Sequence, residues 1–291
     1  MVGRGPPSDR STAERRSFGV INLDKPPGPS SHQVVRWVKD LLGVERAGHA
    51  GTLDPKVTGC LPVLVGDATR LAQALVVGRK EYVAVLEAHD RVPTGFETVF
   101  DEFEAEIFQK PPRKSAVTRR LRTRSIYALD PLETTDRQVL LAIACERGTY
   151  IRKLCHDLGL AMGTGAHMGD LRRTATTPFD DRDLVTMHDL ADAIAYAAAG
   201  DPTELARTLQ PAERALTHLP SVTIAPSAAS TVADGAPVFA PGVIEAPDLD
   251  PADRPLVWCR TPDRGAVCLG RFVGDPDAES GEVVTLERVL V

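Results

Sequence analysis

The stretch from residue 48 to residue 59 has the sequence G-H-A-G-T-L-D-P-K-V-T-G and contains one carboxylate, Asp54. Pro55 fixes its own φ angle, has no N–H group and favours an extended conformation at Asp54. Apolar neighbours such as Leu53 indicate a partly dry carboxylate, and a buried charge without a partner is costly. We therefore expect a stiff loop in which Asp54 has either a cationic partner or a function.

Two further features of this region bear on that expectation. Gly48, Gly51 and Gly59 indicate that another group comes close to the loop backbone. Arg152, in R-G-T-Y-I-R (147–152), is expected near the edge of an apolar helix face. It can be a surface arginine, or it can be the cation that Asp54 needs.

Strand and helix patterns are mixed along the chain. Strands are expected from Phe18 to Leu23, from Leu61 to Val65, from Tyr82 to Leu86 and from Gln138 to Cys145. Helices are expected after Ser30 or Ser31, after Asp67, after Thr149 and from Met187 to Ala199. Because the elements do not alternate regularly as βαβ units, the pattern favours an α+β fold over a doubly wound sheet.

The composition predicts three regions. Residues 1–17 are polar and rich in Gly, Pro and Arg, which is typical of a mobile tail. Residues 18–215 hold the mixed elements. Residues 216–291 contain short strand-like runs separated by Gly, Pro and Asp turns, which predicts a small all-β module.

Bulk properties exclude several classes of protein. The five cysteines are scattered without a C-x-x-C pair, which argues against a zinc ribbon or a disulfide framework and is typical of a reducing cytoplasm. The N-terminus lacks the apolar core of a signal peptide, and no apolar run is long enough to span a membrane. We therefore expect a cytoplasmic protein.

The net charge of −6 argues mildly against nucleic-acid binding, but the distribution of charge argues for it. Between Ile107 and Leu129 there is no acidic residue. The same segment holds the cations Lys110, Arg113, Lys114, Arg119, Arg120, Arg122 and Arg124. It can form a local basic surface on an acidic protein, or it can be a solvated charged loop.

Common cofactor signatures are absent from the sequence. Neither G-x-x-x-x-G-K-[ST] nor G-x-G-x-x-G occurs, and no spacing of His, Cys and carboxylate residues indicates a metal site. Lys25-Pro26-Pro27-Gly28 and the strand residue Tyr82 are further candidates, although an ordinary turn and a core aromatic are the more common explanations of such residues. Carboxylate chemistry without a cofactor or metal is the expectation that remains.

These segments together resemble the TruB family of pseudouridine synthases, in the archaeal and eukaryotic branch that includes dyskerin. The motifs are G-H-A-G-T-L-D-P-K-V-T-G (48–59), L-D-K-P-P-G-P-S-S-H (23–32) and G-T-Y-I-R (148–152). Residues 109–127 are similar to the dyskerin branch, and residues 219–243 are similar to the start of a PUA RNA-binding domain. The motifs occur in the expected order, which makes the resemblance specific.

The resemblance implies isomerisation of uridine to pseudouridine in RNA. The catalytic domain (18–215) would contain a mixed, mainly antiparallel sheet, and residues 216–291 would form a β-barrel-like PUA domain. Asp54 would be the catalytic aspartate, which either attacks the ribose C1′ or removes a ribose proton; both routes remain open. Tyr82 would stack on the flipped base, and Arg152 would pair with Asp54.

Further positions would contact the substrate. His49 would lie against the RNA, Lys25 and Pro26 would shape the pocket wall, and Leu171 in A-H-M-G-D-L-R-R (166–173) would line it. The glycines of the Asp54 loop would let an RNA backbone come close. The basic segment, with Arg119, Arg120 and Arg122, would bind phosphate, which positions RNA without reading its sequence.

The resemblance also implies partners. A box H/ACA guide RNA would select the target uridine in rRNA, small partner proteins would complete the particle, and the PUA domain would hold the ACA end of the guide. The chain ends at Val291 without the lysine-rich tail of eukaryotic relatives, which favours an archaeal protein.

Three alternatives are a stand-alone synthase acting on the T-loop uridine of tRNA, an N-glycosidase that releases the base, and a non-catalytic RNA scaffold. Asp54, Tyr82 and Arg152 together argue against the scaffold.

Overall fold

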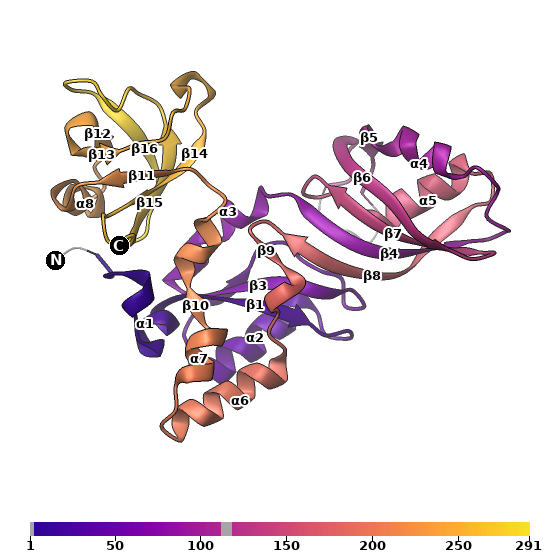
Figure 1. The fold of residues 1–291 in the computed structure, drawn as a ribbon, viewed down its shortest axis with the longest axis horizontal. Helices are drawn as coiled ribbons and strands as arrows, with labels where there is room; N and C mark the ends of the chain where they lie inside the picture. Colours follow the sequence, from indigo (N-terminus) through magenta and orange to yellow (C-terminus); the bar gives the residue numbers. More distant parts are fainter. Residues whose placement is uncertain (1–2, 112–117) are drawn as a thin grey trace.

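Two β-sheets organise the protein. The computed structural model describes residues 3–111 and 118–291, and within them one sheet has ten strands and the other has six (Figure 1). The large sheet has the order β10 (Gln210–Pro211), β1 (Phe18–Lys25), β3 (Thr58–Gly66), β8 (Ala166–Thr176), β4 (Lys80–Ala88), β7 (Gln138–Cys145), β6 (Arg122–Thr134) and β5 (Glu106–Gln109). Two short strands pair at its side, β2 (Ala47–His49) with β3 and β9 (Phe179–Asp180) with β8.

The pairing confirms the expected α+β fold with a mixed, mainly antiparallel sheet. Only β3 and β8 run parallel among the paired strands described in the large sheet. The expected strand from Gln138 to Cys145 is confirmed with the same bounds. The strands β6 and β8 were not expected from the sequence.

Helices cover the large sheet in two groups. The α4 (Glu97–Phe103) and α5 (Ile151–Ala161) helices pack with β4, β6, β7 and β8 around one apolar cluster. The α2 (Ser31–Leu42), α6 (Met187–Ala198) and α7 (Thr203–Thr208) helices pack with β1 and β3 around another. Tyr82 and Leu171 contact both clusters, so they lie where the two halves of the sheet meet.

Helix starts follow local capping chemistry only in part. Ser30 caps α2 through a capping box with Gln33, as expected. Trp37 and Leu41 of α2 are apolar but exposed. Asp67 does not cap a helix: it binds Arg4 and Arg46, and residues 67–76 form a 3-10 turn followed by α3 (Ala72–Val76). The residue before α5 is Tyr150 rather than Thr149.

The second sheet forms a nearly closed barrel, as expected for the C-terminal module. Its strands have the order β12 (Val238–Phe239), β16 (Glu282–Val289), β15 (Ala266–Phe272), β14 (Leu256–Arg260), β11 (Ser221–Ile224) and β13 (Val243–Glu245). The α8 helix (Pro226–Ala233) packs on β15 and β12. The sheet confirms the strand-rich module that the short strand-like runs of residues 216–291 predict.

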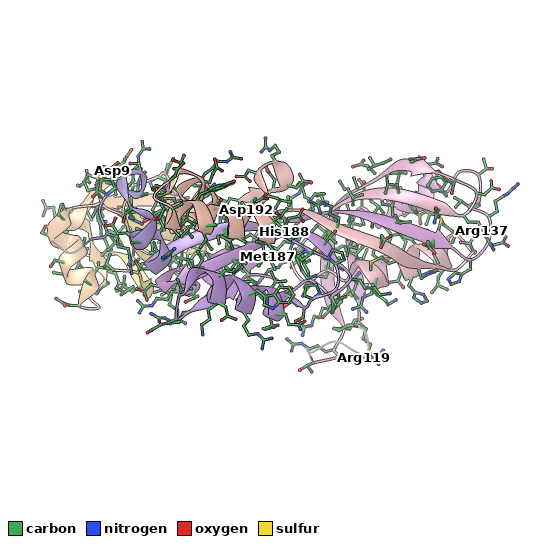
Figure 2. The ribbon with its side chains drawn as sticks, turned by 90° about the horizontal axis from the view of Figure 1, so that it is seen from below. Asp9, Arg119, Arg137, Met187, His188 and Asp192 are labelled. Carbon is green, nitrogen blue, oxygen red and sulfur yellow. The ribbon has the colours of Figure 1, made fainter. Side chains whose placement is uncertain are left out.

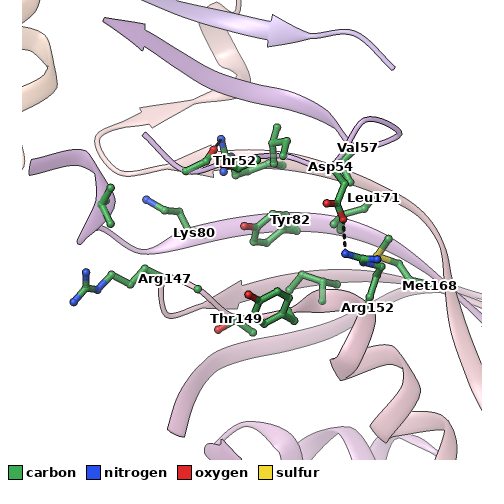
Figure 3. A pocket seen from close by; sticks show the side chains of 17 residues that line it. Thr52, Asp54, Val57, Lys80, Tyr82, Arg147, Thr149, Arg152, Met168 and Leu171 are labelled. Atoms are coloured by element: carbon green, nitrogen blue, oxygen red, sulfur yellow. Dashed lines mark hydrogen bonds and ion pairs between the residues drawn. The ribbon is translucent and has the colours of Figure 1, made fainter. Parts of the chain in front are cut away.

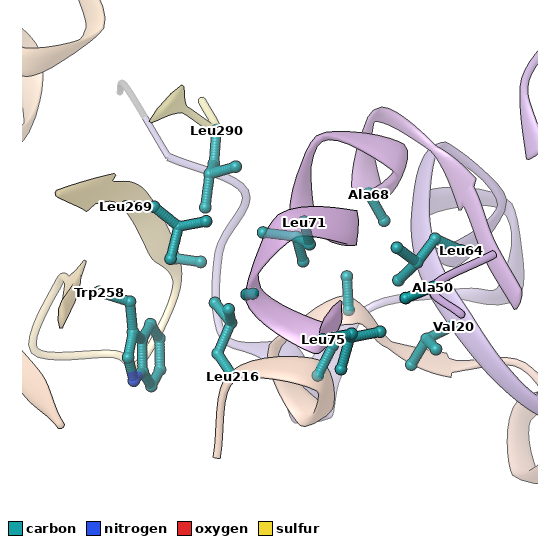
Figure 4. Close-up of a cluster of buried hydrophobic side chains, with 14 of the residues drawn as sticks. Val20, Ala50, Leu64, Ala68, Leu71, Leu75, Leu216, Trp258, Leu269 and Leu290 are labelled. Atoms are coloured by element: carbon teal, nitrogen blue, oxygen red, sulfur yellow. The ribbon is translucent and has the colours of Figure 1, made fainter. Parts of the chain in front are cut away.

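A shared apolar cluster joins the two units. Leu71 and Leu75 beside β3 pack with Leu216 and with Trp258, Leu269 and Leu290 of the barrel (Figure 4). Because the cluster contains side chains from both units, it fixes the barrel against the large sheet.

The N-terminal segment differs from the expected mobile tail. Residues 12–17 form the α1 helix (Thr12–Ser17) with a capping box between Ser11 and Glu14. Arg10 is buried and forms an ion pair with Glu213. The polar composition misled the prediction because the arginines of this segment bind carboxylates and carbonyl groups of the folded protein instead of water.

Among the described residues, no helix is long and apolar enough to cross a membrane.

Candidate active site

The Asp54 loop connects β2 to β3, and the Lys25 side chain binds its backbone through hydrogen bonds. The Lys25 side chain is fully buried, and its Nζ donates hydrogen bonds to the carbonyl oxygens of Pro26 (2.9 Å), Pro55 (3.0 Å) and Val57 (2.9 Å). Burial lowers the pKa of Lys25, and the Asp54 carboxylate opposes that shift. Lys25 therefore fixes the loop on both sides of Asp54.

Two other side chains hold the same loop. The Ser31 hydroxyl accepts a hydrogen bond from the Leu53 N–H at 2.9 Å and donates one to the Leu53 carbonyl at 3.0 Å. The buried Arg173 guanidinium donates to the carbonyl oxygens of Gly51 (3.1 Å) and Cys60 (2.7 Å). The carboxylate of Asp54 is thus carried by a backbone that is held by side chains from β1, α2 and β8.

Asp54 and Arg152 form the ion pair that the sequence led us to consider. Arg152 lies in the first turn of α5, and its Nη2 is 2.8 Å from Oδ2 of Asp54 (Figure 3). The expected dry environment was wrong, because the side chains of Asp54 and Arg152 are 51% and 44% exposed. The apolar neighbours Leu53 and Val57 point into the core and leave the carboxylate at the surface.

A pocket of about 500 Å³ opens beside this pair. Asp54, Tyr82, Arg152 and Leu171 all line it, as does Met168. Its other walls come from the Asp54 loop, from the segment before α5 and from residues Val76, Lys80 and Arg173. The structure therefore brings the three expected catalytic residues and Leu171 into one cavity, which is large enough for a single nucleotide base and part of its sugar.

Tyr82 lies in the middle of this pocket (Figure 3). Burial raises the pKa of its phenol, and a hydrogen bond with the Arg173 side chain acts in the opposite direction. The phenol is therefore neutral at neutral pH, and the ring presents a flat apolar surface in the cavity.

Three expected substrate contacts lie outside the pocket lining. Lys25 and Pro26 are behind the Asp54 loop, where Lys25 supports the loop rather than forming the wall. His49 in β2 is half-buried with its ring edge against His32, at 5.1 Å between ring centroids. Burial lowers the pKa of His49 to about 4, and the neighbouring His32 and Arg173 side chains act in the same direction, so the ring is neutral at neutral pH.

Two of the loop glycines, Gly51 and Gly59, are required by contacts within the protein. At Gly59 the φ angle is +98°, and a Cβ would lie 2.2 Å from the backbone oxygen of Arg173. At Gly51 the φ angle is +88°, and a Cβ would lie 3.2 Å from the Arg173 guanidinium. Both positions therefore let β8 and its arginine come close to the loop.

The described residues of the basic segment lie in and beside β5 and the first part of β6. Arg119 and Arg120 are exposed, and Arg122 begins β6. Arg119 donates to the Pro111 carbonyl at 3.0 Å, and Figure 2 shows it projecting from the body of the molecule. Arg113 and Lys114 lie outside the described residues. Gln109 at the end of β5 connects this segment to the pocket, because its amide binds the backbone of Tyr150 just before α5.

Sequence reasoning missed two buried cations in the pocket, Lys80 and Arg173. Lys80 stands two residues before Tyr82, so strand alternation places both on the same face, which was a usable signal. Arg173 stands two residues after Leu171 in β8, a strand whose mixed composition did not indicate burial.

Among the described residues, no group of three or more His, Cys, Asp or Glu side chains could hold a metal ion.

Comparison with known protein families gives three matches. The model of the TruB family pseudouridylate synthase N-terminal domain matches residues 39–151, and that of the tRNA pseudouridylate synthase B C-terminal domain matches residues 152–217. The DKCLD domain model matches residues 3–35, which includes the N-terminal segment and the Lys25 loop.

Similar proteins extend over the whole chain. A probable tRNA pseudouridine synthase B of Halobacterium salinarum is 65% identical over 99% of each chain. That of Haloarcula marismortui is 62% identical over 100% of this chain and 94% of its own.

Two solved structures are also similar over nearly the full length. A chain in the crystal structure of a Cbf5-Nop10-Gar1 complex is 44% identical, with a TM-score of 0.92 over 98% of this chain and 89% of its own. A chain in an H/ACA RNP bound to a substrate RNA containing 2′-deoxyuridine is 42% identical, with a TM-score of 0.90 over 99% of this chain and 90% of its own.

Proposed function

This chain belongs to the TruB family of pseudouridylate synthases and is an RNA pseudouridine synthase, and we propose that Asp54 is its catalytic carboxylate. The observation that carries the assignment is the 2.8 Å pair of Asp54 with Arg152 at the mouth of a pocket that also contains Tyr82. The side chains around the Asp54 loop support it, because they hold the carboxylate in one position, as a reacting group requires.

The pocket chemistry follows from the geometry of a nucleotide in RNA. A uridine must leave its stack before a protein group can reach its ribose. In the pocket, the uracil lies against the ring of Tyr82 and the side chain of Leu171, and the ribose lies toward Asp54. Asp54 starts cleavage of the bond between C1′ and N1, the base turns, and C1′ joins C5. The atoms of uridine and pseudouridine are the same, so the reaction needs no redox partner.

Arg152 orients the carboxylate of Asp54 through their 2.8 Å ion pair. In the free protein, water reaches both groups, so the pair contributes little to folding. A bound RNA covers the mouth of the pocket and removes that water. The attraction between the two charges then becomes stronger, because it is less screened.

We infer that the protein acts in a box H/ACA ribonucleoprotein, where a guide RNA selects uridines in rRNA. The support is the similarity to the Cbf5 chains, which were solved with Nop10 and Gar1 and in an H/ACA RNP with substrate RNA. Small partner proteins of that kind, guide RNA and target RNA are thus the proposed partners. The barrel of residues 216–291 is the proposed holder of the guide RNA, next to a catalytic domain of residues 18–215.

Direct action on tRNA is the second candidate. Its support is that the relatives from Halobacterium salinarum and Haloarcula marismortui carry the name of a tRNA pseudouridine synthase. For both candidates we propose a cytoplasmic location, which agrees with five cysteines that are all free thiols.

Reconstitution tests these proposals. The purified protein is given a tRNA in one reaction, and guide RNA, target RNA and partner proteins in another, and pseudouridine is mapped in each product. Asp54→Asn should abolish product while RNA binding remains, and the exposed Asp192→Asn, on α6, should behave as wild type (Figure 2). Turnover by Asp54→Asn would refute the assignment of Asp54. A product lighter than the substrate would indicate base release instead of isomerisation.

A further inference from the structure

Lys80 lies at the opposite end of the pocket from the Asp54–Arg152 pair. It is the first residue of β4, it is buried, and Tyr82 stands between it and the ion pair (Figure 3). Among the residues that the structure describes, its Nζ donates one hydrogen bond, to the carbonyl oxygen of Leu75 at 2.9 Å. An ammonium group has three donors, so two remain for a ligand in the cavity.

The charges around Lys80 are positive. Burial lowers its pKa to about 7, and repulsion from Arg173 adds to the effect. Arg147 on the pocket rim acts in the same direction, whereas Cys60 and Cys145 oppose it. Within residues 3–111 and 118–291, no carboxylate lies at ion-pair distance from Lys80. This end of the pocket therefore favours a ligand atom that carries negative charge.

The other cations at this end differ from Lys80 either in their hydrogen bonds or in their exposure to solvent. Arg173 is committed to the carbonyl oxygens of Gly51 and Cys60 and to the phenol of Tyr82. Arg147 is exposed to solvent. Lys80 is the described cation here that is both buried and only partly hydrogen-bonded, which is the arrangement that stabilises a charge formed during a reaction.

The proposed reaction forms such a charge. When the bond between C1′ and N1 breaks, its electron pair stays on the uracil and spreads over N1, O2 and O4. The base then turns, C1′ bonds to C5, the C5 proton leaves, and N1 gains a proton. The charge on the base is present only between these two bond changes, so a donor at O2 or O4 acts on the intermediate more than on bound uridine.

We propose that Lys80 is a further catalytic residue, whose ammonium donates a hydrogen bond to a carbonyl oxygen of the detached uracil. The inference rests on the proposed function, because it requires the uracil to lie on Tyr82 with its ribose toward Asp54. A lysine with only a structural role would support the end of α3 through Leu75 and would not respond to the chemistry of the base.

The first experiment measures single-turnover pseudouridine formation at saturating RNA. Lys80→Met should lower the rate by about 10²-fold, as loss of one preorganised donor does, with RNA affinity unchanged. Arg79→Met is the matched control: the neighbouring residue has an exposed side chain paired with Glu81, and its loss should leave the rate as in wild type. A wild-type rate for Lys80→Met would overturn the proposal.

The second experiment replaces one oxygen of the target base. Sulfur is a weak acceptor, so RNAs with 2-thiouridine or 4-thiouridine at the target test O2 and O4 separately. With one of the two, Lys80→Met should cost less than about tenfold, compared with about 10²-fold for uridine. Equal losses with all three RNAs would show that Lys80 does not touch the base and would overturn the proposal.

A third measurement covers the case that Lys80→Met does not fold. In wild type, the single-turnover rate should fall as the pH rises above about 7, because the ammonium of Lys80 loses its proton. Lys80→Arg stays charged and should lack that decline. An unchanged decline in Lys80→Arg would overturn the proposal. Failure of the proposed function itself would appear separately, as turnover by Asp54→Asn.

Discussion

Arg10 and Glu213 form a buried, two-pronged ion pair between the N-terminal segment and the turn that precedes the barrel. Nη1 and Nη2 of Arg10 lie 2.9 and 2.7 Å from the two carboxylate oxygens of Glu213. The same carboxylate accepts a hydrogen bond from the backbone N–H of Ala266 in β15 at 3.1 Å. One carboxylate thus joins the N-terminal segment to the barrel.

Removing Arg10 should destabilise the protein strongly. Arg10→Met leaves the Glu213 carboxylate buried without its cation, and loss of one partner of a buried pair costs about 3–5 kcal/mol. Chemical denaturation measures the free energy of unfolding. Arg46→Met, which removes an exposed partner of Asp67, should cost less than about 1 kcal/mol. Equal stabilities of the two variants would show that the Arg10 pair does not anchor the segment.

The N-terminal segment illustrates where sequence reasoning failed. Polarity indicated a tail, but Glu213, the carboxylate partner of Arg10, is 203 residues away in the sequence, and no local pattern identifies it. Strand β7 was predicted with its full bounds because its apolar residues are continuous, whereas β8 was missed because A-H-M-G-D-L-R-R mixes charge with burial. Because β8 was not predicted, the burial of Arg173 within it was not predicted either.

Within the site, the sequence predicted which residues meet better than it predicted how exposed their side chains are. The need of Asp54 for a cation led to Arg152, and the ion pair confirms their proximity. The dry carboxylate was wrong, because neighbours in sequence do not determine which way an exposed loop turns each side chain. Lys25 was expected to shape the pocket wall, but it binds three carbonyl groups of the Asp54 loop instead. These carbonyl groups come together only in the folded loop.

Arg152→Met should separate stability from catalysis. Because both side chains of the pair are about half exposed, the free energy of unfolding should change by less than about 1 kcal/mol. The rate of pseudouridine formation should fall by about 10²-fold or more, since Asp54 loses its orienting cation. Thermal melting and single-turnover kinetics on one preparation check both parts, and a large loss of stability or a normal rate would contradict the proposed role.

Lys25→Met should act through the loop. It removes the donor to three carbonyl groups, and the Asp54 loop is then free to shift. A displacement of about 1 Å can cost 10²-fold in rate, so we expect a fall in kcat of about that size without a matching loss of RNA affinity. Lys39→Met, on α2 and outside the lining of the pocket, is the control and should keep full activity. An unchanged kcat for Lys25→Met would show that Ser31 and Arg173 hold the loop without it.

His49 should make the protein less stable in acid. Its folded pKa is about 4 because of burial, whereas an unfolded histidine takes up a proton near pH 6.5, so the unfolded state binds more protons between those values. The free energy of unfolding should therefore fall as the pH decreases from about 6.5 to 4. In His49→Gln that fall should be shallower, with the exposed His188→Gln matching wild type. Parallel pH profiles for all three proteins would contradict the assignment.

The basic segment should contribute to RNA affinity through phosphate contacts. Arg120 and Arg122 stand at the start of β6, and reversal of both charges replaces attraction with repulsion. Each lost phosphate contact lowers the slope of log affinity against log salt by about 0.7–0.9, so Arg120→Glu with Arg122→Glu should bind more weakly and show a slope smaller by about 1–2.

The matched control carries the same change of charge on another surface. Arg91→Glu with Arg137→Glu alters exposed residues near the β6–β7 turn, and Figure 2 shows Arg137 at the end of the molecule, apart from Arg119. Filter binding at several salt concentrations should leave the control slope close to wild type. If both double variants lose the same slope, the effect is due to net charge alone, and the segment is a solvated loop rather than a phosphate-binding surface.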